Sequence, residues 1–503
     1  MHTFADPLQR AKLLAKNRVG VIDGDQQFTF GELADRCARL AAGLRALGCE
    51  QGDRVAILAN NGHEYIETYV GVPASGLVVV PLNTRHAEPE LRYALEDAGA
   101  KVLIADRDVS AISGSVETVL DMQAYEELVQ GAEPMALGEG VAENDLAGLF
   151  YTGGTTGKSK GVMLSHRNLI SNTFHWLMTV PHEPEDMELV IAPLFHAAGS
   201  NGVLGAIWKT TPQVTLAAFD PKQTLDLIEK HRATHTLGVP AMLSGIAEEQ
   251  HSNPRDVSSM RYISHGGSPI ATEVVRRVAT AMPQTEVVEV YGATELSPLT
   301  TVLRHEEQLL DDPRGRSCGP PVPGNDIRIL APDGKELPTG EIGEVTTRGP
   351  NVMQGYWNKP EQTEAVLKGG AYWTGDLGYM DDEGFLYLVD RSKDMIVSGG
   401  ENVYCTEVEE VLYTHPAVLE AAAFGVPDDK WGEAVHAVVV PRAEHANVDP
   451  AEIIEHCRAQ IAGYKVPKGI DIQQEPLPKS GPGKVLKREL RAPFWDGKER
   501  GVN

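Results

Sequence analysis

Short apolar runs alternate with helical patterns along most of this chain. The runs 54–58 and 76–82 are almost continuously apolar, which is typical of strands buried on both faces of a mainly parallel sheet. The alternation continues along the chain, with strands expected at 101–105, 188–192, 233–237 and 286–290 and helices at 88–98, 166–177, 221–231 and 271–280. This pattern predicts an α/β fold in which helices are layered over mainly parallel sheets.

One helix has a start and a stop that can be read from the sequence. Thr29 and Glu32 have the spacing of a capping box, in which each side chain accepts the other residue's backbone N–H. Apolar residues follow at helical spacing, at positions 33, 37, 40 and 44, and Gly48 ends the pattern.

The organisation of the chain changes twice towards its end. At 503 residues the chain exceeds the size at which one hydrophobic core keeps growing, so several units are expected. Between about 316 and 390 the pattern changes to short β segments broken by glycines, which predicts a small β subdomain within an N-terminal domain of residues 1–391. We expect residues 392–503 to form a small mobile α+β domain, hinged near 391–394.

Composition and charge exclude several classes of protein. The chain has 45 basic and 71 acidic residues and a net charge of −26, which argues against a nucleic-acid surface because such surfaces are basic. The five cysteines are widely separated without a CxxC pair, so they predict no disulfide framework and no zinc site. No signal sequence or apolar run long enough to span a membrane is present, so we expect a cytoplasmic protein without an integral membrane segment. The oligomeric state, including a homo-oligomer, stays open.

A stretch rich in glycine, threonine and lysine directly follows the apolar run 146–150. Glycine lets backbone N–H groups turn towards an anion, while threonine hydroxyls and lysines add donors and charge. The composition predicts a phosphate-binding loop, although a flexible surface hairpin remains an alternative. Its residues are Thr152, Gly153, Gly154, Thr155, Thr156, Gly157, Lys158, Ser159, Lys160 and Gly161.

The spacing in this loop does not fit a Walker-type P-loop. That motif needs a glycine five positions before its Gly-Lys-Ser/Thr end. Gly157 and Lys158 fit the end, but Thr152 occupies the position that requires glycine. The sequence therefore argues against an ordinary P-loop NTPase.

Four further clusters combine glycine turns with groups that can carry chemistry. Each alone has a purely structural explanation, and their joint order along the chain carries the information. They are Tyr291-Gly292-Ala293-Thr294-Glu295, Thr374-Gly375-Asp376, Ser398-Gly399-Gly400-Glu401-Asn402 and Gly481-Pro482-Gly483-Lys484.

This order resembles the superfamily of AMP-forming acyl-CoA synthetases, peptide-synthetase adenylation domains and luciferases. The resemblance spans nearly the whole chain and rests on six motifs in the same order. They are the phosphate loop, Gly266-Gly267, the 291–295 segment, the 374–376 turn, Asp390-Arg391-Ser392-Lys393-Asp394 and Gly483-Lys484. The resemblance implies an acid–CoA ligase that uses ATP, Mg²⁺ and coenzyme A on a carboxylic acid that is a small molecule.

The resemblance also implies a role for each matching residue. The loop from Thr152 to Lys160 would cradle the β- and γ-phosphates of ATP, Thr294 would hydrogen-bond the α-phosphate, and Glu295 would hold Mg²⁺. Tyr291 would stack on adenine beside Gly266 and Gly267, followed by Gly292 in the same motif. Asp376, supported by Arg391, would accept from the ribose hydroxyls.

The C-terminal motifs would serve both half-reactions. Lys484 matches the family's adenylation lysine, which stabilises charge in the transition state. Lys393 matches the hinge about which the C-terminal domain rotates, and Gly399 and Gly400 would line the pantetheine channel. Where the family usually has serine, proline and proline, this chain has Gly153, Ser159 and Cys405, and the chemistry requires none of these three.

The resemblance places the acyl pocket at His196, Ala197, Gly199 and Ser268, among others. Because the stretch after Pro193 is rich in small residues and lacks arginine, we expect a bulky or elongated hydrophobic acid and not a dicarboxylate. Two alternatives stay open: an adenylating enzyme that loads a carrier protein, and a non-catalytic nucleotide-binding protein on the same fold. The Trp431-Gly432-Glu433 segment resembles acyl-CoA synthetases and favours CoA as the acceptor.

Overall fold

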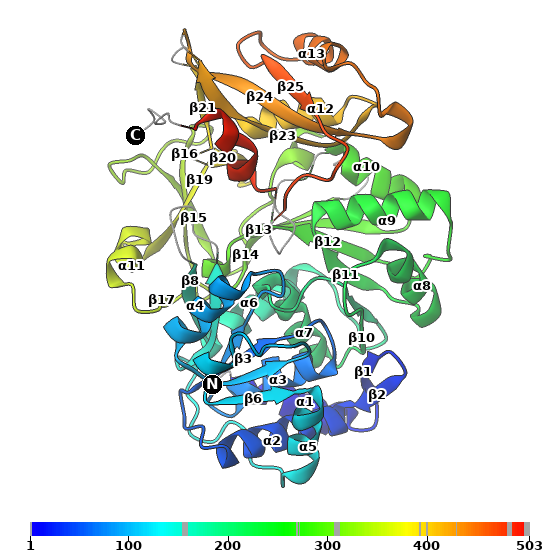
Figure 1. Ribbon diagram of the computed structural model, residues 1–503, viewed down its shortest axis with the longest axis vertical. Helices are drawn as coiled ribbons and strands as arrows, with labels where there is room; N and C mark the ends of the chain where they lie inside the picture. Colours follow the sequence, from blue (N-terminus) through cyan, green and yellow to red (C-terminus); the bar gives the residue numbers. More distant parts are fainter. Residues whose placement is uncertain are drawn as a thin grey trace.

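Four β-sheets with helices packed against them organise the described residues. The computed structural model describes residues 3–152, 159–267, 270, 272–305, 312–391, 394–398, 401–428, 430–479 and 485–496. In Figure 1 the C-terminal elements occupy the top of the view, the N-terminal elements the bottom, and helices α8–α10 the right-hand side.

A seven-stranded sheet contains the apolar runs predicted as buried strands. Its strand order is β17-β8-β7-β4-β3-β5-β6, and β3, β4, β5 and β6 are joined in parallel. Alternate residues of β3 to β5 point into two different apolar clusters, so both faces are covered. The strands are β3 Arg54–Leu58, β4 Val78–Pro81, β5 Ala100–Ala105, β6 Thr118–Asp121, β7 Leu146–Thr152, β8 Lys160–Ser165 and β17 Gly355–Tyr356.

An eight-stranded sheet follows the same plan, with the order β14-β13-β12-β11-β9-β10-β1-β2. Only the edge pairs β1–β2 and β13–β14 are antiparallel among its described pairings. The strands are β1 Val19–Asp23, β2 Gln26–Thr29, β9 Glu188–Val190, β10 Gln213–Thr215, β11 His235–Gly238, β12 Tyr262–Gly266, β13 Glu286–Gly292 and β14 Leu299–His305.

Helices cover both sheets and fill the space between them. Helix α6 lies between the sheets, because its Leu169 packs into the core of the first and its Trp176 into that of the second. The helices around the first sheet are α1 Ala5–Ala15, α2 Phe30–Ala46, α3 His63–Ala74, α4 Glu88–Ala98 and α5 Met122–Gly131. Those between the sheets or on the second are α6 His166–Thr179, α7 Ala197–Lys209, α8 Pro221–His231, α9 Pro240–Ser252 and α10 Thr272–Ala281.

Two smaller five-stranded sheets follow. The first, largely from the segment expected to be a β subdomain, is antiparallel and comprises β15 Asp326–Leu330, β16 Gly343–Arg348, β18 Leu367–Lys368, β19 Ala371–Met380 and β20 Leu386–Arg391. The second comprises β21 Ile396–Ser398, β22 Glu401–Val403, β23 Val418–Asp428, β24 Gly432–Pro441 and β25 Gly469–Ile472. The remaining helices are α11 Pro360–Val366, α12 Cys405–Tyr413, α13 Pro450–Arg458 and α14 Lys487–Arg491.

The structure confirms the predicted fold class, and several element bounds agree closely. The capping box at Thr29 and Glu32 is present, and helix α4 has the predicted bounds. One pairing was not anticipated: β17 lies within the 316–390 segment but pairs with β8 of the seven-stranded sheet. All five cysteines are free and buried, Cys405 among them. Among the described residues, no helix is both long enough and apolar enough to cross a membrane.

Candidate active site

Three residues predicted to hold the nucleoside meet through one hydrogen bond and one ion pair. The Tyr291 hydroxyl, at the end of β13, donates to Asp376 Oδ2 at 2.8 Å. Arg391 Nε lies 3.0 Å from Asp376 Oδ1, because Asp376 and Arg391 are direct partners across β19 and β20. Each carboxylate oxygen of Asp376 therefore has one partner, Tyr291 or Arg391. Burial, and next the charge of Asp376, raises the pKa of Tyr291 well above its usual value, so its hydroxyl stays a donor.

The prediction of a turn at Thr374-Gly375-Asp376 was wrong, because these residues lie within strand β19, where its register with β16 shifts. This irregular part of the strand is held by Glu344, a residue absent from the sequence prediction. Glu344 Oε1 accepts from the backbone N–H of Gly375 at 3.0 Å, and Gly375 has φ +73°, a conformation that favours glycine. The Thr374 hydroxyl accepts from the backbone N–H of Asp376 at 3.0 Å and donates to the Val345 carbonyl. No sequence signal marks Glu344, because its role depends on pairing between β16 and β19.

Glu295 and Lys160 approach each other through another residue absent from the sequence prediction, Tyr356. The Tyr356 hydroxyl donates to Glu295 Oε1 at 2.8 Å, and Lys160 Nζ lies 4.7 Å from the centre of the Tyr356 ring. Thr152 and Lys160 face each other as antiparallel partners in β7 and β8. Thr152 and Lys160, which flank the predicted phosphate loop, are thus paired across two antiparallel strands, close to the predicted Mg²⁺ ligand Glu295.

Tyr372 connects these two groups electrostatically. It is buried, and its pKa is raised first by burial and then by nearby groups that include the carboxylates of Glu295 and Asp376. Tyr372 therefore stays neutral between the two acids. The Tyr291, Asp376 and Arg391 group and the Glu295 group therefore both lie near Tyr372.

Glycines of the Gly266-Gly267 and 291–295 motifs let neighbouring backbone segments lie close together. Gly266 is the partner of Val290 across the parallel strands β12 and β13, and Gly267 follows with φ +81°. A Cβ on Gly292 would lie 1.9 Å from the Pro298 carbonyl oxygen. The ends of β12 and β13 lie near the middle of the view in Figure 1. Thr294 begins a short 3₁₀ turn, Thr294–Leu296, directly after them.

The predicted acyl-pocket residues lie at the start of α7. His196 caps this helix, with Nδ1 accepting from the Ala198 N–H at 3.3 Å, and enclosure by protein lowers its pKa to about 4. Ala197 is buried. A Cβ on Gly199 would lie 2.6 Å from the Pro193 carbonyl oxygen, so the close turn requires glycine here.

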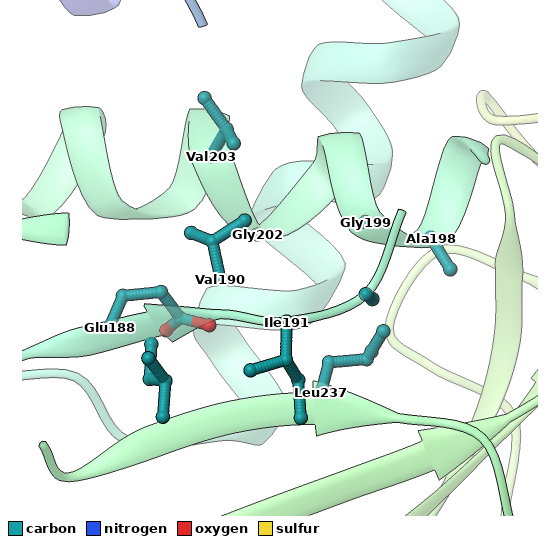
Figure 2. Close-up of a pocket in the computed structure, with 10 residues that line it drawn as sticks. Glu188, Val190, Ile191, Ala198, Gly199, Gly202, Val203 and Leu237 are labelled. Carbon is teal, nitrogen blue, oxygen red and sulfur yellow. The ribbon is translucent and has the colours of Figure 1, made fainter. Parts of the chain in front are cut away.

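A small cavity lies between α7 and strand β9. Figure 2 shows Gly199, Gly202 and Val203 on the helix above Val190 and Ile191, with the Glu188 carboxylate beside them. Its volume of about 20 Å³ is close to that of a single water site. An acyl chain does not fit in this cavity as it stands.

Several predicted site residues lie outside the described residues. They are Gly153, Gly154, Thr155, Thr156, Gly157, Lys158, Ser268, Lys393, Gly399, Gly400 and Lys484. Their assignments stay predictions, as do the individual roles of the described site residues.

Comparison with known proteins shows the family of this chain. The family model described as AMP-binding enzyme matches residues 8–357, and the model of the AMP-binding enzyme C-terminal domain matches residues 407–484. The chain belongs to the AMP-binding enzyme family. This confirms the predicted resemblance.

Individual relatives agree with this assignment over almost their full lengths. A feruloyl-CoA synthase from Amycolatopsis is 40% identical over 97% of this chain and 98% of its own length. A long-chain-fatty-acid–CoA ligase from Bacillus subtilis is 35% identical over 92% of this chain and 90% of its own. The solved o-succinylbenzoate coenzyme A synthetase from Bacillus subtilis, in complex with ATP and magnesium ion, is 32% identical with a TM-score of 0.86, covering 97% of this chain and 99% of its own.

The expected activity is confirmed at the level of the family. The chain is an AMP-forming acid–CoA ligase that uses ATP, Mg²⁺ and CoA. The described site fits Mg²⁺, a hard cation that prefers oxygen ligands, because Glu295 offers a carboxylate already oriented by Tyr356.

Proposed function

We propose that this chain activates a bulky hydrophobic carboxylic acid as its acyl-adenylate and then passes the acyl group to CoA. A carboxylate is a poor electrophile because resonance and its charge oppose attack by a nucleophile. Attack of the carboxylate on the α-phosphate of ATP releases pyrophosphate and leaves a mixed anhydride with a good leaving group. The CoA thiol then displaces AMP. The observation that carries the proposal is the contact of Tyr291 and Arg391 with Asp376, with Glu295 held by Tyr356 and both carboxylates near Tyr372.

Each part of this group has a proposed task in the first half-reaction. Asp376, held by Tyr291 and Arg391, would accept from the ribose hydroxyls, and the Tyr291 ring would pack on adenine. Glu295 would hold Mg²⁺, which neutralises phosphate charge when bound. The flanks Thr152 and Lys160 would position the loop that cradles the β- and γ-phosphates.

We further propose that residues 392–503 turn as one body about residues 391–394 between the half-reactions. In support, β21–β25, α12 and α13 share an apolar core of their own. Contact with the larger domain includes Asp390 Oδ2, at the end of β20, which accepts from the Cys405 N–H at 2.8 Å. A few polar contacts of this kind can break and re-form during a rotation.

The proposed preference for a hydrophobic acid rests on residue types and not on the volume of the small cavity. Ala197, Ala198 and Gly199 open α7 with minimal side chains. Glu188 adds a buried carboxylate to the cavity wall beside them. The cavity itself is too small for an acyl chain, but a second carboxylate on a substrate bound against this wall would be disfavoured, since like charges close together in a protein interior disfavour each other.

A panel of acids tests this proposal. Ferulate, a long-chain fatty acid, malonate and o-succinylbenzoate would each be given with ATP and Mg²⁺, with and without CoA, and AMP and thioester would be measured. We expect a thioester with ferulate or the fatty acid and only in the presence of CoA. Equal turnover of malonate would contradict the proposed acid class. Transfer only to a carrier protein would select the carrier-loading alternative, and absence of AMP with every acid would favour the non-catalytic one.

Replacing Tyr356 with phenylalanine tests the role of Glu295. The change removes a 2.8 Å hydrogen bond to the carboxylate, and hydrogen bonds to charged groups contribute about 1.5–3 kcal/mol. After allowance for partial exposure, we expect the Mg²⁺ concentration for half-maximal pyrophosphate release to rise about ten-fold.

Tyr387→Phe is the matched control, because its hydroxyl also donates to a carboxylate, Asp381 Oδ2 at 3.1 Å, away from Glu295. It should leave the Mg²⁺ dependence unchanged. If Tyr356→Phe also leaves it unchanged, Tyr356 does not position a metal ligand.

A further inference from the structure

Three side chains that can bind a metal share one face of the eight-stranded sheet. His265 on β12 and Glu289 on β13 are direct partners across the parallel pair. His305 on β14 pairs with Val287, two residues before Glu289 on the same strand. Because residues two apart on a strand point to the same face, all three side chains project together.

The donor atoms of this group are already close to one another. One ligand atom from each of His265, Glu289 and His305 lies within 4.8 Å of the others, and His305 Nε2 is 3.5 Å from Glu289 Oε2. Two donors at the usual bond lengths from a tetrahedral zinc ion are about 3.4 Å apart. Small side-chain rotations would therefore complete the geometry.

Both histidines lack the hydrogen bonds that buried rings normally make. The two residues are 0% and 6% exposed, yet neither ring nitrogen of His265 or of His305 has a hydrogen-bond partner in the part of the chain that the structure describes. Buried polar atoms nearly always have a hydrogen-bond partner, and a bound ion is one recognised reason for an exception.

We propose that His265, Glu289 and His305 bind one Zn²⁺ ion. Two imidazole nitrogens and one carboxylate are a common zinc ligand set, which leaves a fourth position for water. Mg²⁺ and Ca²⁺ fit less well because they prefer oxygen ligands throughout. Cys318 lies beside the group, with Sγ donating to Glu289 Oε1 at 3.8 Å, and would orient this carboxylate.

The bound ion would link strands that lead into the proposed nucleotide site. His265 directly precedes Gly266, and Glu289 lies two residues before Tyr291. An ion shared by β12, β13 and β14 would therefore fix the ends of the first two strands relative to each other. This effect is separate from the Mg²⁺ proposed at Glu295.

The other acidic histidine cluster of the described residues does not need a metal. Its members are Asp23, His63 and Glu64. His63 Nδ1 already lies 2.7 Å from Asp23 Oδ2, and His63 also stacks on Phe28. The ring nitrogens of His265 and His305 make no hydrogen bond among the described residues, which is why the inference concerns them.

Metal titration of the full chain tests the site. Protein freed of metal with a chelator, without nucleotide or Mg²⁺, would be titrated with Co²⁺, whose visible absorption reports its ligand geometry, and with Zn²⁺ by calorimetry. We expect one equivalent to bind with a tetrahedral Co²⁺ spectrum and Zn²⁺ to raise the melting temperature. His305→Asn and the near-isosteric Glu289→Gln should each weaken metal binding by more than about 100-fold. Mutating a residue that only hydrogen-bonds to a metal ligand already lowers metal affinity about 10–100-fold, and these two residues are proposed as ligands themselves.

Two control variants distinguish this site from other binders. Glu295→Gln removes the proposed Mg²⁺ ligand, and His456→Asn removes part of a surface histidine pair whose ring centres are 5.0 Å apart. Both should keep full Co²⁺ binding. Unchanged binding in Glu289→Gln, loss in His456→Asn, or no tetrahedral spectrum at one equivalent would overturn the proposal. X-ray absorption of the zinc-loaded natural protein, which needs no variant, should show two imidazole ligands, and their absence would equally overturn it.

Discussion

Replacing Lys484 with alanine is expected to slow acyl-adenylate formation by about 10²–10³-fold, the usual cost of losing one charge-stabilising contact in a transition state. As the carboxylate attacks, negative charge grows on the oxygens around the α-phosphate, and an ammonium group there stabilises it. The thioester step from preformed acyl-adenylate should be largely retained, because in our proposal the C-terminal domain has by then turned away. Pyrophosphate release measures the first step, and thioester formation from synthetic acyl-adenylate measures the second.

Lys468→Ala is the control for a general effect of charge on the C-terminal domain. Lys468 is an exposed lysine of the same domain, just before β25, and its loss should change neither step. Equal loss of both steps in Lys484→Ala would contradict the two-stage assignment. Loss of neither would remove Lys484 from the chemistry altogether.

The elements of the fold were predictable where local pattern and tertiary structure agree. The strand at Arg54–Leu58 and the helix at Glu88–Ala98 have the predicted bounds, because an apolar run buried on both faces and a clean helical period leave few alternatives. The contact of Asp376 with Arg391 was implied by the resemblance, and the pairing of β19 with β20 places the two residues opposite each other.

The supporting residues of the site could not be predicted in this way. Tyr356 lies on a two-residue strand, too short for any periodicity, and reaches Glu295 only because β17 pairs with β8, which is distant from it in the sequence. The same holds for His265, Glu289 and His305, which are spread over three strands without a spacing motif. The cysteine pattern predicted no zinc site, and it could not detect a ligand set built from histidine and glutamate.

Replacing Asp376 with alanine should raise the KM for ATP by about 10–100-fold. The carboxylate binds Tyr291 and Arg391 at 2.8 and 3.0 Å, and in our proposal it also accepts from the ribose. Hydrogen bonds to a charged group contribute about 1.5–3 kcal/mol, and each 1.4 kcal/mol is a factor of ten. Because the ribose does not change during the reaction, the contact should act equally on bound ATP and on the transition state, so kcat at saturating ATP should change little.

Two further variants separate nucleotide binding from support of the fold. Asp376→Asn keeps an acceptor for the Tyr291 hydroxyl but loses the charge beside Arg391, so its KM should lie between those of the natural protein and Asp376→Ala. Asp381→Asn is matched to it, because Asp381 also accepts from a tyrosine hydroxyl next to β19, and its KM should not change. If Asp376→Ala instead lowered kcat with KM unaltered, the carboxylate would act on the reacting phosphate and not on the ribose, and the proposed placement of the nucleoside between Tyr291 and Asp376 would be wrong.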